Sequence, residues 1–387
     1  MSAAPPPPGP LGPLSILQLH GRFDGSAAKD RRIARLMNHW GSKARHDLLL
    51  AEPGADAGRA LIDPAVPVRF LAEPAFGPNG GPGRYVALAQ LMRDYDLILS
   101  FGWGGIDGVI AQRLLGLLMG LPPLIHHEDG SDLRAVGPLG FNSDFYRRHS
   151  LGAARALVVP TGRLAHVAIG QWGEPAAHVK QIPDGIDIAS YGGRRLRSEL
   201  PGVAEDGRLI LGARVEDAEP HMLDQLLRAV APLDEAVRLI LLDAPGEDAV
   251  LAARAEALGV HGLCAPATLP RPQDYLGALD IFLLLSAGEP APLALTEAMA
   301  AGLPVVATET GDVAEMLAPP NRAFAVPPGD DTALAKALAR LAGDAALREK
   351  LGAANQRRAA QCFDESVMFD LYGRLYGSVA GREEALS

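Results

Sequence analysis

The sequence predicts an α/β protein made of two domains, each built on a parallel sheet. The chain has 387 residues, which is enough for two domains of ordinary size with separate cores. Short apolar runs of strand length alternate along it with longer segments of helical periodicity. The clearest run is Ile281–Leu285, which lacks polar residues, as strands buried on both faces do.

The residues after this run complete a β-α-β unit. Pro292 suits the first turn of a helix, where its missing N–H costs little, and Gly302 suits the helix end. A second apolar strand follows. Two carboxylates with seven residues between them, Glu289 and Glu297, thus lie after the carboxyl end of the first strand. Open parallel sheets bind their ligands at that end.

Composition excludes several other classes of protein. Hydrophobic content of 48% is that of a globular protein, and the longest apolar region, 109–125, is too interrupted to span a bilayer. The two cysteines have neither the number nor the spacing of a disulfide framework, which predicts a reducing, cytoplasmic location. The net charge of −10 arises after Asp187, which argues against a nucleic-acid partner.

The N-terminal half shows strands and helices in alternation. Strands are expected at 14–19, 46–50, 68–71 and 96–100, and a short one runs into His126 and His127. Helices are expected at 28–40 and 108–119.

Two glycine-bearing loops in this half follow strands. One holds Gly21 and Arg22, and the other holds Gly102 and Gly104. Such a loop before a helix N-terminus can accept an anion or a sugar hydroxyl, although a plain turn fits as well.

Four basic residues lie in the first helix: Lys29, Arg31, Arg32 and Arg35. The favoured interpretation is a solvated helix face. The alternative is peripheral contact with anionic lipid headgroups at the inner face of a membrane, or with a charged acceptor.

The run His126-His127-Glu128-Asp129 follows a short apolar strand. Adjacent residues on a strand point to opposite faces, so these side chains cannot all bind one ion. We therefore predict no metal site.

Several segments resemble the family 4 glycosyltransferases, which have the GT-B fold. The Glu289…Glu297 pair is similar to their E-x7-E segment, and 297–308 matches it almost letter for letter. Further similar segments are 181–187, 209–215 and 311–315. The resemblance implies two Rossmann-like domains that face each other across a cleft.

The resemblance also implies a function. It implies a retaining glycosyltransferase that moves a sugar from a nucleoside diphosphate-sugar to a hydroxyl of a glycan or lipid-linked acceptor, without metal or other cofactor. The implied donor-binding residues are Arg214, Glu289, Ala291, Leu293 and Glu297. Arg214 would neutralise the diphosphate, Glu297 would hold the ribose and Glu289 the sugar. The acceptor side would hold Gly21, Arg22, Gly102, Gly104 and His126, and His127 and Asp129 would join Glu289 and Arg214 as catalytic residues.

Three departures from the family pattern support a second interpretation. Glu219 stands where the family has a lysine, Asp129 where it has a histidine, and Pro292 is unusual in the donor loop. A binding or partner subunit with little activity would tolerate all three. A nicotinamide-dependent oxidoreductase is supported only by the doubly wound pattern.

The expected domain boundaries follow from the same segments. They are a flexible tail at 1–13, an acceptor-side domain at 14–187, a linker at 188–206, a donor domain at 207–362 and a terminal helix at 363–387 that crosses back to the first domain.

Overall fold

The computed structural model divides into two compact units, unit 1 (Met1–Pro183 with Met368–Ser387) and unit 2 (Asp184–Val367). It describes residues 12–77, 81, 83–130, 143–193, 200, 206–215, 220–242, 249–264, 269, 271–286 and 292–386. Within them, no helix is long and apolar enough to cross a membrane.

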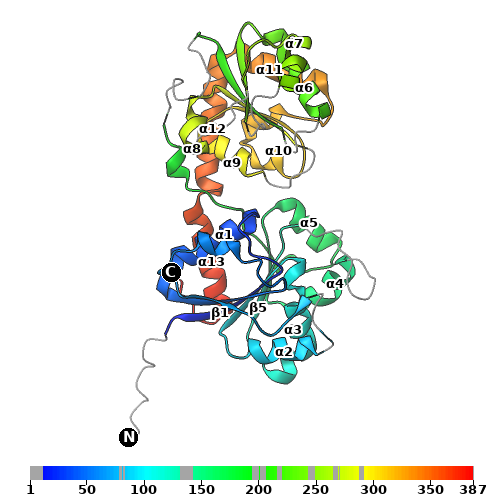
Figure 1. Cartoon of the computed structure of the whole chain (residues 1–387), viewed down its shortest axis with the longest axis vertical. Coiled ribbons are helices and arrows are strands. Elements are labelled where there is room, and N and C mark those ends of the chain that lie inside the picture. The colour runs from blue at the N-terminus through cyan, green and yellow to red at the C-terminus, as the bar shows by residue number, and fades with distance from the viewer. Residues whose placement is uncertain are drawn as a thin grey trace. The chain divides into compact units, whose positions relative to one another are not determined.

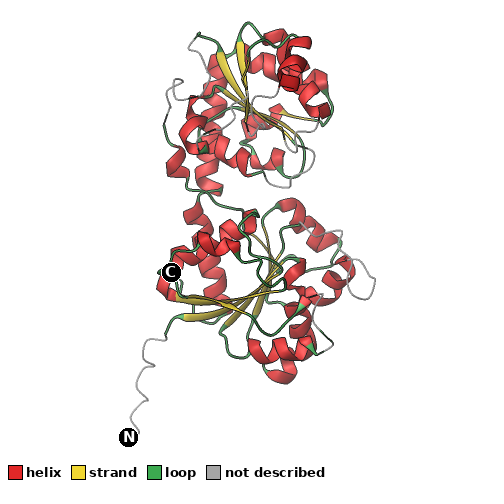
Figure 2. Ribbon diagram, viewed as in Figure 1, coloured by secondary structure: helices red, strands yellow, loops and turns green. Residues whose placement is uncertain are grey.

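Unit 1 contains a parallel sheet with strand order β3-β2-β1-β4-β5-β6-β7 (Figures 1 and 2). The strands are β1 (Leu14–His20), β2 (Ala44–Leu50), β3 (Val68–Leu71), β4 (Leu97–Phe101), β5 (Leu124–His127), β6 (Ala156–Val159) and β7 (Val179–Gln181). The helices are α1 (Ala28–Trp40), α2 (Arg84–Met92), α3 (Ile106–Met119), α4 (Ser143–Ser150), α5 (Gly162–Gly170) and most of α13 (Glu365–Val379).

Helices cover both faces of this sheet. One core joins α1 and α13 to the face that carries Ile16, Leu99 and Ile125. A second core joins α2, α3 and α5 to the opposite face. Both faces of the strands are therefore buried, which explains their continuous apolar runs. The strands are added to one side of β1 up to β3 and to its other side from β4 onward. The boundary between β1 and β4 is the switch point at which such sheets bind ligands.

Unit 2 repeats the plan with a parallel sheet of order β10-β9-β8-β11-β12-β13. The strands are β8 (Leu209–Val215), β9 (Val237–Leu242), β10 (Leu263–Cys264), β11 (Ile281–Leu285), β12 (Val305–Thr308) and β13 (Ala325–Val326). The helices are α6 (Pro220–Val230), α7 (Ala249–Ala257), α8 (Pro272–Tyr275), α9 (Leu293–Ala300), α10 (Val313–Met316), α11 (Asp331–Gly343) and α12 (Ala345–Cys362).

Strand β11 shows why an unbroken apolar run was needed. Phe282 and Leu284 enter one core, while Leu283 and Leu285 enter the core on the other face. The switch point of this sheet lies between β8 and β11. Each unit therefore has one expected ligand edge, at the carboxyl ends of its central strands.

The α/β fold with two parallel sheets confirms the predicted fold class. Helix α1 and strands β3 and β11 have the predicted bounds. The predicted linker is in part wrong, because Tyr191 and Leu200 are buried in a core of unit 2. Apolar side chains spaced along that segment provide the burial that a solvated linker lacks.

Candidate functional site

Arg214 and Glu297 flank the switch point of unit 2. Arg214 lies near the carboxyl end of β8 and is paired in register with Leu284 of β11. Glu297 lies in α9, the helix that follows β11, and its side chain is half-buried. The two residues therefore belong to neighbouring β-α segments of the sheet, and their donor-binding roles stay predictions.

Tyr191 supports Glu297 and was missed by the sequence analysis. The Tyr191 hydroxyl donates a hydrogen bond to Glu297 Oε1 at 3.0 Å. Tyr191 itself is buried, in the short helical turn Ile188–Tyr191. The bond orients the carboxylate and leaves its charge intact, as is needed to accept hydrogen bonds from a ligand diol. No sequence pattern predicts this contact, since it joins residues 106 positions apart.

Thr308 fixes the end of β11, from which the donor loop departs. The Ser286 N–H donates to Thr308 Oγ1 at 2.8 Å, and the same hydroxyl donates to the Ser286 carbonyl at 3.0 Å. Helix α9 then begins at Leu293 after Pro292, which has no side-chain oxygen to cap the helix. A helix N-terminus of this kind favours an anion.

Three predicted residues lie outside the described part of the chain. They are Glu219, Glu289 and Ala291. Their roles stay predictions, as does the effect of a carboxylate at position 219.

In unit 1, the two glycine loops meet. A Cβ added to Gly104 would lie 2.3 Å from Gly21 Cα and 2.4 Å from the Gly21 nitrogen. Gly102 has φ 55° and ψ −161°, a conformation that only glycine adopts readily. The glycines are thus required for close backbone packing at the switch point. Arg22 is exposed and forms ion pairs with Asp24 (3.2 Å) and Glu52 (3.4 Å), at the rim of the same loop.

His126 belongs to a buried polar network and not to an acceptor surface. Ser100 Oγ lies 2.8 Å from His126 Nδ1, and His126 Nε2 lies 3.2 Å from Glu128 Oε1. Arg147 Nε and Nη2 donate to the two oxygens of Glu128 at 2.6 and 3.1 Å. Burial would raise the pKa of Glu128, but the His126 hydrogen bond and the Arg147 charge lower it. Placement of His126 against the acceptor is therefore wrong.

His127 is also buried, at 2% exposure. Its Nε2 lies 2.7 Å from the Tyr376 hydroxyl, and its Nδ1 lies 3.3 Å from the Ser100 carbonyl. Burial and the nearby Arg32 charge lower its pKa well below the usual range. Both nitrogens are thus occupied by protein partners, so the structure gives no support to the predicted catalytic role of His127, which stays a prediction.

Asp129 points out of this cluster toward α1. Its carboxylate lies 3.8 Å from Lys29 Nζ, and the two side chains are 22% and 18% exposed. Arg32 is buried at 6%. Lys29 and Arg32 therefore turn into unit 1, near the carboxyl ends of β1 and β5. The predicted solvated or membrane-facing basic surface on α1 is wrong for Arg32, whose position one turn along from Lys29 places it against the core.

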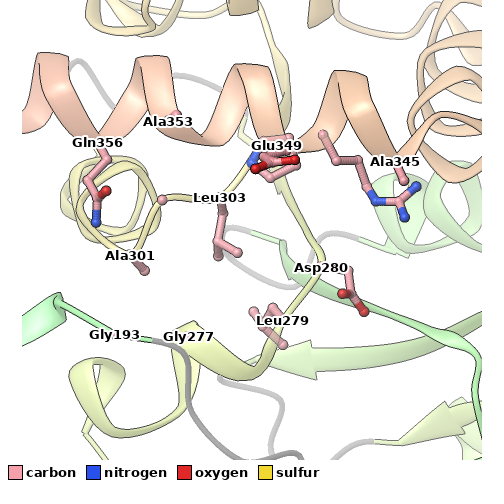
Figure 3. A pocket seen from close by; sticks show the side chains of 13 residues that line it. Gly193, Gly277, Leu279, Asp280, Ala301, Leu303, Ala345, Glu349, Ala353 and Gln356 are labelled. Carbon is pink, nitrogen blue, oxygen red and sulfur yellow. The ribbon is translucent and has the colours of Figure 1, made fainter.

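Unit 2 contains a pocket of about 710 Å³ whose lining includes Leu279, Asp280 and Leu303 (Figure 3). Asp280 and Pro304, which line it, directly precede β11 and β12. The pocket therefore lies at the amino ends of these strands, opposite the edge at which parallel sheets bind ligands. Among the described residues, no group of three or more His, Cys, Asp or Glu has the arrangement of a metal site.

Part of the chain matches a known family of proteins. Residues 213–358 match the family described as glycosyl transferases, group 1. A D-inositol 3-phosphate glycosyltransferase of Xylanimonas cellulosilytica is 29% identical over 244 residues, 58% of each chain. A phosphatidyl-myo-inositol mannosyltransferase of Mycobacterium leprae is 29% identical over 209 residues, 52% of this chain and 54% of the relative. The chain thus matches little more than half the length of these relatives.

Solved structures share the fold across both units. HepE of Anabaena, in complex with UDP, has a TM-score of 0.68 at 20% identity and covers 95% of this chain and 100% of its own. A glycosyltransferase of Rickettsia africae has a TM-score of 0.71 at 13% identity, covering 95% and 98%. At these identities the likeness concerns the fold alone.

Proposed function

We propose that this chain, whose residues 213–358 match the glycosyl transferases, group 1, moves a sugar from a nucleoside diphosphate-sugar to an acceptor hydroxyl. The single observation that carries the proposal is the placement of Arg214 and the Tyr191-supported Glu297 at the switch point of unit 2. A cation, a carboxylate and a helix N-terminus at one sheet edge are what a nucleotide with a diphosphate requires.

UDP is the nucleotide to test first. The structure of HepE that resembles this chain was solved with UDP. The acceptor class is a glycan or a lipid-linked molecule, and two relatives are named for inositol-containing acceptors. Peripheral membrane contact and a cytoplasmic location remain predictions.

The chemistry follows from the charges at the edge. The acceptor oxygen forms a bond to the anomeric carbon, the bond from that carbon to the diphosphate breaks, and the acceptor proton leaves with the diphosphate. Arg214 and the N-terminus of α9 would stabilise the charge that develops on the leaving group. This arrangement uses no metal ion and is compatible with retention at the anomeric carbon.

Titration of UDP into the purified chain tests the donor site. We expect micromolar binding that Glu297→Gln weakens at least tenfold, or about 1.4 kcal/mol, because a neutral amide accepts weaker hydrogen bonds from the ribose diol. Glu256→Gln removes an exposed carboxylate from α7 and serves as the control. Binding that is equal in both variants would remove Glu297 from the donor site. No binding of any nucleoside diphosphate would favour a non-catalytic partner subunit.

A further inference from the structure

Three rings at the ends of neighbouring strands form a stacked row in unit 1. His20 ends β1, Phe101 ends β4 and His127 ends β5. His20 stacks on Phe101 with ring centroids 4.3 Å apart and planes at 7°, and Phe101 stacks on His127 at 4.5 Å and 18°. All three are buried. The row runs along the ligand edge of the sheet, across its switch point.

Helix α13 closes one end of this row. The Tyr372 ring lies 6.0 Å from the His127 ring at 25°, and the Tyr376 ring meets it edge-on at 5.7 Å. The Tyr376 hydroxyl is 2.7 Å from His127 Nε2. These residues are separated by 249 positions in the sequence, so the C-terminal helix completes a site that begins in β5.

The partners of His127 determine its tautomer. The Ser100 carbonyl, 3.3 Å from Nδ1, can only accept, so Nδ1 carries the proton. Nε2 is then an acceptor, and the Tyr376 hydroxyl donates to it. Burial and the Arg32 charge keep the ring neutral. Tyr376 is therefore the only donor to His127 Nε2 among the described contacts.

The backbone of His127 holds the loop that packs on Gly21. Its carbonyl accepts a hydrogen bond from the Gly102 N–H at 2.7 Å. Gly104, in the same loop, lies against Gly21 so closely that a Cβ would come within 2.3 Å of Gly21 Cα. A shift of His127 would therefore be transmitted to both glycine loops.

We propose that Tyr376 is a positioning residue for the acceptor half of the site, which it orders through His127 and the ring row. The assignment of this half to the acceptor rests on the proposed function, whereas the ordering of the two glycine loops does not. Phe at 376 keeps the ring in the core and removes only the hydroxyl, so the variant isolates one hydrogen bond.

Amide hydrogen exchange and histidine NMR of the full chain test this inference. In Tyr376→Phe, we expect amides at 20–25 and 101–105 to exchange at least ten times faster than in the unmodified chain. We also expect the ¹⁵N resonance of His127 Nε2, an unprotonated nitrogen, to shift while Nδ1 stays protonated. Tyr372→Phe removes a hydroxyl from the same helix without removing the donor to Nε2, and should leave both readouts unchanged.

Two outcomes would overturn the inference. One is unchanged exchange of both loops in Tyr376→Phe, and the other is a protonated Nε2 in the unmodified chain. UDP titration separates this result from the proposed function, because Glu297 and Arg214 lie in unit 2. We expect UDP to bind equally to Tyr376→Phe and the unmodified chain. If neither binds UDP, the donor assignment fails, while the exchange data still decide the role of Tyr376.

Discussion

Glu128 and Arg147 form the most deeply buried ion pair among the described residues of the candidate site. Their side chains are 1% and 0% exposed, and the pair is bidentate. The guanidinium carbon of Arg147 also lies 5.1 Å from the centre of the Trp172 ring. Removing one partner of such a pair strands a charge in an apolar surrounding, which costs more than the pair contributes when intact.

We expect Glu128→Gln to lower the free energy of unfolding of unit 1 by about 3–5 kcal/mol. Asp370→Asn breaks an exposed pair with Arg374, whose side chains are 71% and 75% exposed, and should cost less than about 1 kcal/mol. Tryptophan fluorescence during urea unfolding measures both, because Trp40, Trp103 and Trp172 all lie in unit 1. Equal losses in the two variants would contradict the account of this pair.

At this scale the sequence predicted some roles and missed others. The strand that carries Arg214 and the helix that carries Glu297 were predictable from apolar runs and helix-end residues, while the roles of the two side chains stay predictions. His126 and His127 resembled accessible groups because a strand ending shows neither the arrival of Tyr376 nor that of Arg147. The burial of Arg32 was not predicted for a similar reason, since charged helix residues are usually solvated.

The pair of glycine loops after β1 and β4 shapes the switch point of unit 1. Gly21 and Gly104 were predicted from their position between strand and helix. Their mutual contact was not predictable, because it depends on the adjacency of β1 and β4, which the chain order does not state. Strand periodicity gives the strands themselves and leaves their order in the sheet open.

Gly104→Ala should disrupt this contact. Its Cβ would meet backbone atoms of Gly21 at 2.3 Å, and backbone cannot rotate away as a side chain does. We expect unit 1 to lose about 1–3 kcal/mol of stability by tryptophan fluorescence. Gly170→Ala, at the end of α5, meets no atom within 4 Å and should leave stability unchanged or raise it. A stable Gly104→Ala variant would show that the loops lie farther apart.

At the scale of the whole molecule, buried histidines in unit 1 make the free energy of unfolding depend on pH. Four described histidines of unit 1 are buried, namely His20, His46, His126 and His127, and three of them have a lowered pKa. Burial, with the Lys29 charge, lowers the pKa of His20 from 6.5 to about 3, and burial lowers that of His46 to about 4. The pKa of His127 is lowered as well. The unfolded state therefore binds more protons than the folded state below pH 6.5.

The free energy of unfolding of unit 1 therefore decreases as the pH drops below 6.5, the histidine pKa in the unfolded state, toward the lower pKa values of the folded state. Each histidine contributes about 1.4 kcal/mol per pH unit in that window. Between pH 7.5 and about pH 5.5, the three together should destabilise unit 1 by about 4 kcal/mol. His178 has a raised pKa through its hydrogen bond to Glu174, and so opposes this loss. His178→Gln should therefore increase the loss of stability of unit 1 at low pH. Tryptophan fluorescence that shows no acid destabilisation would mean that these rings are hydrated.

Sugar transfer from a nucleoside diphosphate-sugar is tested most directly by ³¹P NMR of the reaction. The unmodified chain is incubated with UDP-glucose and other UDP-sugars in EDTA, with D-inositol 3-phosphate, phosphatidylinositol vesicles or a glycan as acceptor. We expect the signals of one UDP-sugar to be replaced by those of UDP, at a rate that Arg214→Ala lowers a hundredfold or more through lost stabilisation of the leaving group. Turnover that EDTA abolishes and manganese restores, or no turnover of any UDP-sugar, would contradict the account.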